Sequence, residues 1–474
     1  MTVVYYPGWG IYGREHFINS INFDDVSEIS YAFFDVESDG SLRTIDNYEW
    51  AEKAFSAQDS ISGVPDTWED GDARGNQNQL AQLAEQYPDV SINIALGGWT
   101  LSDDFSTAVL DQNRDNLINN IVEMARDNPW ITGFDMDWEF PGSGGQSGNT
   151  IRAEDGENYA KFLEGLNIAL DGLSAETGQD YTISVASPPG LTQVDTFGFE
   201  YGVAEQADII NLMAYDYHGG WENNTGLQAG IFDDYSNTSS PGIAATIKAM
   251  IERGVDIEKV NLGIPLYARG WNIDPETEIA NAIGAPSLSA VTGSFEAGIY
   301  DAKDILTTIA NNPSEWTVVY DTDSMAAFAL SETGEFVSIE TRSTVALKAA
   351  WAKANDFNGL MFWDSSSDLE GTGASLVEAG NDVWEGRQTV ADIIATDIIQ
   401  FDQFIGSGEF YDLLTLDPTG LPISAIQAQE NLNEQGAETD LELSNSNNTD
   451  GSTVPDEDIQ VDMSETTEDS SEIA

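Results

Sequence analysis

The sequence predicts an α/β fold, a (β/α)8 barrel of the TIM type with a small α+β insertion between its seventh and eighth strands. Three observations lead to this prediction. Apolar runs of strand length recur eight times within roughly 385 residues, and segments with helical periodicity lie between many of them. Residues capable of chemistry cluster where these runs end, and such barrels build their sites at the carboxyl ends of the strands.

The eight barrel strands are assigned from the apolar runs. We expect them at Thr2 to Tyr6, Ile29 to Val36, Val90 to Leu96, Ile131 to Trp138, Tyr181 to Ser187, Ile209 to Tyr215, Val260 to Leu266 and Gly359 to Trp363. Helical periodicity predicts helices near residues 77–87, 105–126, 156–174, 240–253 and 343–354. Strands that alternate with helices in this way predict a parallel sheet, and this number of alternations predicts its closure into a barrel.

The chain between the seventh and eighth strands is too long to be a loop. It contains three short runs that read as strands, at Thr317 to Tyr320, Ala326 to Leu330 and Glu335 to Ile339. We therefore expect a small α+β lobe over residues 272–341, forming one wall of a cleft, within a barrel domain over residues 1–385.

The composition changes after about residue 385. Apolar residues recur at helical spacing, namely Val390, Ile393, Ile394, Ile398, Phe401, Phe404 and Ile405. We expect an amphipathic helical extension over residues 386–426 that docks on its own domain. Residues 427–474 are rich in Asn, Ser, Thr, Asp and Glu and contain no Lys or Arg, which predicts a disordered acidic tail.

The net charge is strongly negative. The chain has 83 Asp and Glu against 17 Lys and Arg, a formal net charge of -66. Because nucleic acids and anionic membranes bind basic surfaces, we expect neither as a partner. The acids are spread along the whole chain, which favours a halophilic protein over a calcium or polycation binder. In 1 M salt a Debye length of about 3 Å screens the self-repulsion of such a surface.

Residue types missing from the sequence exclude several classes of site. Without cysteine, disulfides and thiol chemistry are excluded. His16 and His218 are the only histidines, so a His-cluster metal site is excluded, and a Ser-His-Asp hydrolase would have to use His218. No apolar run of transmembrane length and no signal-like start is present. The chain is therefore cytoplasmic, or its export signal is not in this sequence.

The stretch ITGFDMDWEFPG at residues 131–142 combines three acids with an apolar strand. Asp135, Asp137 and Glu139 occupy every second position, so a strand would point all three to one face. A similar alternation at residues 438–442 lies among polar residues and needs no special explanation. Burying charge in an apolar strand costs several kcal/mol, which points to a function. Because neighbouring carboxylates resist ionising together, Glu139, nearest the open end, is the natural general acid.

Further candidate residues lie at the ends of the other predicted strands. They are Tyr6, Gly98, Trp99, Tyr215, Asp216, Tyr267, Arg269 and Trp363. Aromatic rings suit the apolar faces of sugars. Together with paired carboxyls they favour cleavage of a glycosidic bond.

These motifs resemble those of glycoside hydrolase family 18, the chitinases. GFDMDWEF resembles the DGxDxDWE signature of that family. LGGWT at 96–100, MAYDYHGGW at 213–221, GIPLYARGW at 263–271 and GLMFWD at 359–364 resemble its other strand motifs in the same order. The resemblance covers residues 1 to about 385, and the insertion resembles the lobe of the deep-cleft members.

The resemblance implies a role for each matched residue. Glu139 would give a proton to the glycosidic oxygen. Asp137 would orient the substrate acetamide, whose carbonyl oxygen attacks the anomeric carbon, while Asp135 shares charge and proton with Asp137. Tyr215 would hydrogen-bond the acetamide. The other implied substrate contacts are Met213 and Asp216 in the same subsite, Trp363 as its floor, Trp99 and Trp221 beneath neighbouring sugars, and Tyr6, Tyr267 and Arg269 in the wall. No metal or organic cofactor is implied.

Two positions depart from the family pattern. Thr132 stands where the outermost Asp of the signature usually lies, and Ala95 stands where a Ser usually supports the inner Asp. Neither is the proton donor, so we expect activity to survive. The departures affect the expected hydrogen bonding of Asp135, and with it the pH profile.

Three functions are compatible with the resemblance. The first is a monomeric retaining chitinase acting on β-1,4-linked N-acetylglucosamine in chitin or chito-oligosaccharides, and a polymeric substrate favours an extracellular location. An endo-β-N-acetylglucosaminidase on glycans shares the acid motif but has less need of Trp99, Trp221, Trp271 and the inserted lobe. A non-catalytic chitin-binding lectin shares the fold, but such proteins typically lack the acid that is present here as Glu139.

Overall fold

The structure is a computed structural model that describes residues 1–406 except residues 70, 233–241 and 370–372. The acidic tail predicted for residues 427–474 and the end of the predicted extension lie outside the described residues. No helix in the described part of the chain is both long enough and apolar enough to cross a membrane.

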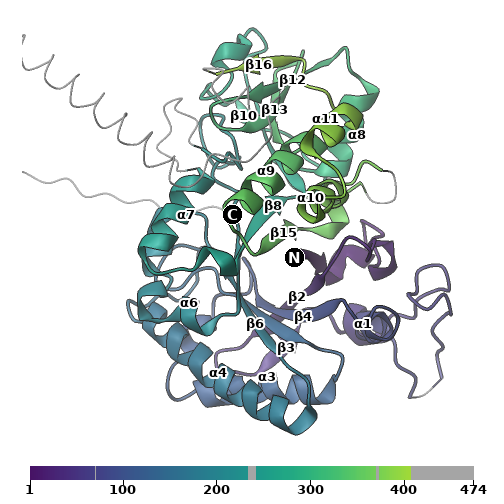
Figure 1. The fold of residues 1–474 in the computed structure, drawn as a ribbon, viewed down its shortest axis with the longest axis vertical. Coiled ribbons are helices and arrows are strands. Elements are labelled where there is room, and N and C mark those ends of the chain that lie inside the picture. Colours follow the sequence, from purple (N-terminus) through teal and green to yellow (C-terminus); the bar gives the residue numbers. More distant parts are fainter. Residues whose placement is uncertain (70, 233–241, 370–372, 407–474) are drawn as a thin grey trace, which may run out of the picture. The chain divides into compact units, whose positions relative to one another are not determined.

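Eight parallel strands close into a barrel (Figure 1). They are β1 (Thr2–Pro7), β2 (Glu28–Val36), β4 (Ser91–Gly97), β5 (Gly133–Asp137), β6 (Thr182–Ser187), β7 (Ile209–Leu212), β8 (Val260–Pro265) and β15 (Gly359–Trp363). The ring closes because β1 pairs with β15 on one side and with β2 on the other. The predicted (β/α)8 barrel is confirmed, and each barrel strand lies at a predicted position.

Most of the helices in the described residues lie around these strands, while the helix at residues 302–311 belongs to the segment inserted between β8 and β15. They are α1 (Gly75–Gln86), α2 (Phe105–Ala108), α3 (Arg114–Asp127), α4 (Asp155–Thr177), α5 (Leu191–Thr196), α6 (Val203–Gln206), α7 (Ile243–Glu252), α8 (Ala302–Asn311), α9 (Arg342–Ala354), α10 (Leu376–Glu385) and α11 (Val390–Thr396). The single helix predicted over residues 105–126 is two helices. Asn113 Nδ2 donates to the carbonyl oxygens of Ser38 and Thr107 at 2.9 and 3.0 Å, and such side-chain bonds compete with helical ones.

The two faces of the barrel strands have different surroundings. The outward face packs into the main apolar core, to which Ile29, Ile94 and Phe134 belong. The inward face lines the lumen, where Val3 and Met361 belong to a smaller buried cluster. This alternation directs every second residue of β5 into the lumen.

A second, antiparallel sheet is formed between β8 and β15. Its strands are β9 (Tyr267–Asn272), β10 (Ser289–Ala290), β11 (Ile299–Asp301), β12 (Trp316–Asp321), β13 (Ala326–Ser331) and β14 (Glu335–Ile339), and β16 (Gln403–Ile405) joins it at the β12 edge. The sheet begins at Tyr267 rather than at the predicted Asn272, because β9 follows β8 almost directly. The first strand of this sheet therefore carries Tyr267 and Arg269.

The prediction of one amphipathic helix through Ile405 is wrong. Helix α11 ends at Thr396, and Gln403–Ile405 form β16 parallel to β12. Asp397 redirects the chain, because its Oδ2 accepts from the amide and hydroxyl of Ser343 at 2.8 and 2.7 Å. The rings of Phe401 and Phe404 then pack on Tyr320, although 44% of the Phe404 surface stays exposed.

Candidate active site

The three acids of the central stretch come from β5 and the residues that follow it. Asp135 and Asp137 belong to the strand, Glu139 lies two residues beyond its end, and all three are buried. The intervening Met136 and Trp138 belong to the main core outside the barrel. The carboxyls therefore form a column along the lumen toward the carboxyl ends of the strands.

Asp135 is held by donors from three other strands. Tyr5 Oη donates to its Oδ2 at 2.7 Å, while Ser184 Oγ and Asn211 Nδ2 donate to its Oδ1 at 2.5 and 3.1 Å. Burial raises the pKa of Asp135, and these hydrogen bonds act in the opposite direction. Ala95 faces Asp135 in the β4–β5 register, so β1, β6 and β7 supply the hydrogen bonds that Ala95 cannot make.

Burial and neighbouring charges raise the pKa values of both Asp137 and Glu139. Burial and then the charges of Glu139 and Asp135 raise the pKa of Asp137 well above its usual range. Burial and then the charge of Asp216 raise the pKa of Glu139 to about 8. Asp137 Oδ1 is buried and has no hydrogen-bond partner among the described residues. The site thus combines a carboxyl group with a raised pKa, Glu139, and a neighbouring carboxyl oxygen without a hydrogen-bond partner among the described residues.

The main chain around Glu139 is fixed by neighbouring loops. Its amide donates to Ser102 Oγ at 2.9 Å, and Asn149 Nδ2 donates to its carbonyl oxygen at 2.9 Å. Gly98 N donates to Asp137 O at 2.7 Å. A side chain at Gly97 would place its Cβ 2.3 Å from Asp137 O, so the close approach of β4 to β5 requires glycine there.

An ion pair forms one wall of the site. Arg269 Nε and Nη2 donate to Asp216 Oδ1 and Oδ2 at 2.8 and 2.7 Å, and Tyr267 Oη donates to Oδ1 at 2.7 Å. Arg269 Cζ also lies 4.9 Å from the centre of the Trp221 ring. This fork fixes the position of the Asp216 carboxyl, and the charge of Asp216 raises the pKa of Glu139.

Aromatic side chains from several strands meet at the mouth of the lumen. The Trp363 ring lies 5.4 Å from Tyr5 and stacks on Phe33 at 5.5 Å. Met213, Tyr215 and Tyr267 belong to the same buried cluster, and Tyr215 Oη approaches Met361 Sδ at 4.0 Å. Burial, followed by Tyr267 and then Asp137, raises the pKa of Tyr215.

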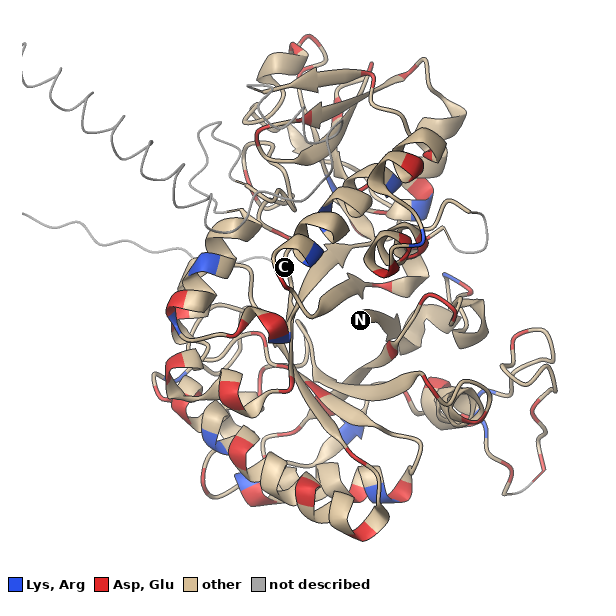
Figure 2. Cartoon of the chain, in the orientation of Figure 1, with Lys and Arg blue, Asp and Glu red and all other residues tan. Residues whose placement is uncertain are grey.

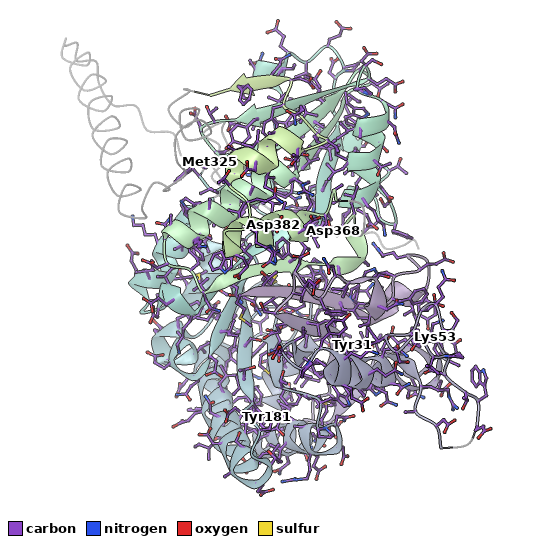
Figure 3. All side chains as sticks on the ribbon, turned by 45° about the vertical axis from the view of Figure 1, so that its right-hand side comes forward. Tyr31, Lys53, Tyr181, Met325, Asp368 and Asp382 are labelled. Atoms are coloured by element: carbon purple, nitrogen blue, oxygen red, sulfur yellow. The ribbon has the colours of Figure 1, made fainter. Side chains whose placement is uncertain are left out.

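The prediction that Tyr6 lines the site is wrong. Tyr6 points outward from the barrel, donates to His16 O at 3.2 Å and packs 6.1 Å from Tyr31, which is labelled in Figure 3. Its neighbour Tyr5 faces the lumen instead, because successive strand residues point to opposite faces. Ser184 and Asn211 were also missed, although polar residues at alternate positions of an apolar strand are a signal for a polar lumen.

The remaining predicted residues lie on the elements that end at the barrel mouth. Trp99 and Trp221 expose 51% and 61% of their surface, so their rings are open to a ligand. Gly98 has φ +96, and a Cβ there would lie 2.7 Å from the Phe33 ring. Among the described residues, no group of three His, Asp or Glu is placed to hold a metal ion.

Comparisons with known proteins point to one family. The model of "Glycosyl hydrolases family 18" matches residues 1–368. Chitinase 1 of Aphanocladium album is 30% identical over 383 residues, covering 78% of this chain and 82% of that protein. Chitinase A of Pseudoalteromonas piscicida is 29% identical over 419 residues, and the match covers 78% of this chain but only 51% of that protein.

A solved structure gives the same result. Chitinase ChiA74 from Bacillus thuringiensis superposes with a TM-score of 0.73 at 25% identity, covering 81% of this chain and 69% of that one. The family model spans more than half of the chain and includes the whole carboxyl column. The chain therefore belongs to glycosyl hydrolase family 18.

Proposed function

We propose that this family member is a retaining chitinase that cleaves β-1,4 linkages between N-acetylglucosamine units by substrate-assisted catalysis. The observation that carries the proposal is the buried pair of Glu139, whose pKa is raised to about 8, and Asp137, whose Oδ1 has no hydrogen-bond partner among the described residues. We propose a monomer as the active form.

The pair supplies the two groups that the reaction needs. Glu139 gives its proton to the glycosidic oxygen as the bond to the anomeric carbon breaks, and the substrate's acetamide carbonyl oxygen bonds to that carbon. Asp137 passes its proton to Asp135, accepts from the acetamide N–H and, as an anion, stabilises the positive charge that develops on the ring being formed. The Glu139 carboxylate then takes a proton from water as the water oxygen replaces the acetamide oxygen. Two displacements at one carbon retain its configuration.

The surrounding residues favour a sugar polymer as substrate. Trp363 packs beside Tyr5 and Phe33, and the exposed rings of Trp99 and Trp221 offer flat apolar surfaces to neighbouring sugars. The fork of Arg269 on Asp216 fixes the wall beside Trp221. An acid poised for proton transfer argues against a purely binding protein. The open aromatic surfaces favour a chain of sugars over a single glycan core.

The proposal is tested by product analysis from defined N-acetylglucosamine oligomers in molar salt, with the anomers followed by proton NMR. We expect cleavage with β-anomers appearing first. Initial α-anomers would contradict retention. Binding without cleavage would favour the lectin, and cleavage confined to the chitobiose core of N-glycans would favour the endo-β-N-acetylglucosaminidase.

We also propose that the acidic surface is an adaptation to concentrated salt. Figure 2 shows the positions of acidic residues on helices and loops around the barrel, with fewer basic residues between them. Because self-repulsion falls as salt screens it, the melting temperature should rise from dilute buffer to 2 M NaCl or KCl. Sucrose at equal osmolality serves as the control. An unchanged melting temperature would refute halophily, and an equal rise with millimolar CaCl2 would favour the calcium binder.

A further inference from the structure

The lumen below Asp135 contains a fourth carboxyl that the proposed reaction does not use. Glu28 opens β2 and is buried, with 1% of its surface exposed. It shares the inward face of β2 with Ser30 and with Ala32 of the lumen cluster. Its Oε1 has no hydrogen-bond partner among the described residues. A buried carboxyl without a protein partner requires a physical explanation.

Two neighbouring polar atoms share this property. Ser30 Oγ on β2 and Asn93 Nδ2 on β4 are also buried without a partner among the described residues. Ser30 and Asn93 face each other in the β2–β4 register, and Asn93 pairs with Gly133, two residues before Asp135. The three atoms therefore lie on adjacent strands in the layers below Asp135. Polar atoms in such an arrangement are the usual ligands of internal water.

The charges that face Glu28 are few. Adjacent β4 has no ionisable side chain, and β1 contributes only the Tyr5 phenol to this face. Across the lumen, Asp135 is the charged group that acts on Glu28, and burial followed by this charge raises the pKa of Glu28 to about 8. Glu28 is thus a neutral acid at neutral pH, at the lower end of a column that continues through Asp135 and Asp137 to Glu139.

We propose that Glu28 is a positioning residue for the reaction, linked through water held by Ser30 and Asn93 to Asp135, so that its protonation state sets the charge of the Asp135–Asp137 pair. While Glu28 is neutral, Asp135 can remain an anion and keep the proton on Asp137. When Glu28 ionises, the added negative charge opposes further loss of protons from the column. The inference rests on the proposed function, because it concerns the same carboxyls.

The test replaces Glu28 by Gln, which keeps the shape and the neutral state but cannot ionise. We expect kcat/KM at pH 6 to stay within twofold of the wild type. In the pH profile of kcat/KM, we expect the fall in activity at alkaline pH to move to lower pH by on the order of half a unit. The reason is that the variant cannot form the negative charge on residue 28 that opposes the ionisation of Glu139. The shift should persist in 2 M salt, which screens surface charges. Glu123→Gln on exposed α3 removes a surface charge and should leave the alkaline fall in place.

Two further measurements do not depend on turnover. At pH 7 the infrared spectrum of Glu28→Gln should lack one protonated carboxyl band. The melting temperature of Glu28→Gln relative to wild type should rise as pH increases from 5 to 9. Glu28 has a higher pKa in the folded wild type than in the unfolded chain, so ionisation of the unfolded state lowers the stability of the wild type as pH rises. The glutamine variant lacks this loss. The proposal would be overturned if Glu28→Gln left the alkaline fall of kcat/KM at its wild-type pH and lowered the melting temperature equally at every pH. Glu28 would then have a merely structural role. Wild-type enzyme inactive on every chito-oligosaccharide would overturn the proposed function alone, since both of these measurements would still report on Glu28.

Discussion

Replacing Glu139 by Gln is expected to lower kcat on a soluble chito-oligosaccharide by about 10²–10⁴-fold, the usual contribution of a general acid. The glutamine keeps the size of the side chain and the hydrogen bonds of its main chain to Ser102 and Asn149. It cannot give a proton to the leaving oxygen. The measurement is steady-state hydrolysis of a chito-oligosaccharide at pH 6 in molar salt, with binding of the same oligomer followed by calorimetry.

Binding and pH dependence distinguish this effect from misfolding. The Kd of the oligomer should change by less than about threefold, since the aromatic surfaces that bind sugar rings are untouched. In the wild type, activity should fall as pH rises through about 8, because the raised pKa keeps Glu139 protonated below that value. Glu123→Gln on the exposed surface is the matched control. Undiminished turnover by Glu139→Gln would remove Glu139 from the mechanism.

The barrel could be predicted because its signals are local. Each strand is a short apolar run, and the alternation in β5 assigns Asp135 and Asp137 to one face before any contact is known. The same rule could not decide between Tyr5 and Tyr6, because both are aromatic and both end up buried. Only the closure of β1 between β15 and β2 shows which of the two enters the lumen.

The parts that were missed depend on contacts between distant segments. Ser184 and Asn211 become donors to Asp135 because the closed barrel brings β6 and β7 to β5, and the sequence does not specify that approach. The apolar repeat after residue 390 has helical spacing, but its later part pairs with β12 instead. Asp397 ends the helix by accepting hydrogen bonds from Ser343, which lies 54 positions earlier in the chain. Periodicity therefore predicted the helix with its buried Val390 and Ile393, but neither the strand that follows nor the exposure of Phe404 on it.

Replacing Asp137 by Asn is expected to lower kcat by about 10²–10³-fold, the usual cost of removing one preorganised group that stabilises transition-state charge. Asn fills the same volume between Asp135 and Glu139. It cannot become an anion, so the positive charge that develops on the acetamide-derived ring would lose its partner. The measurement compares kcat with the affinity for a thiazoline analogue of that ring, and both should fall together in Asp137→Asn.

The comparison with Asp171→Asn makes this prediction specific. Asp171 lies exposed on α4, so its replacement removes one charge without reaching the lumen and should leave both quantities unchanged. Because burial, followed by the charges of Glu139 and Asp135, raises the pKa of Asp137, an uncharged Asn should be tolerated in the fold. The melting temperature of Asp137→Asn relative to wild type should rise as pH increases above about 4, the ordinary pKa of Asp, because the unfolded wild type ionises there while the raised pKa of folded Asp137 opposes ionisation. If kcat fell while thiazoline affinity stayed at the wild-type value, Asp137 would act on proton transfer through Glu139 rather than on the charge of the substrate.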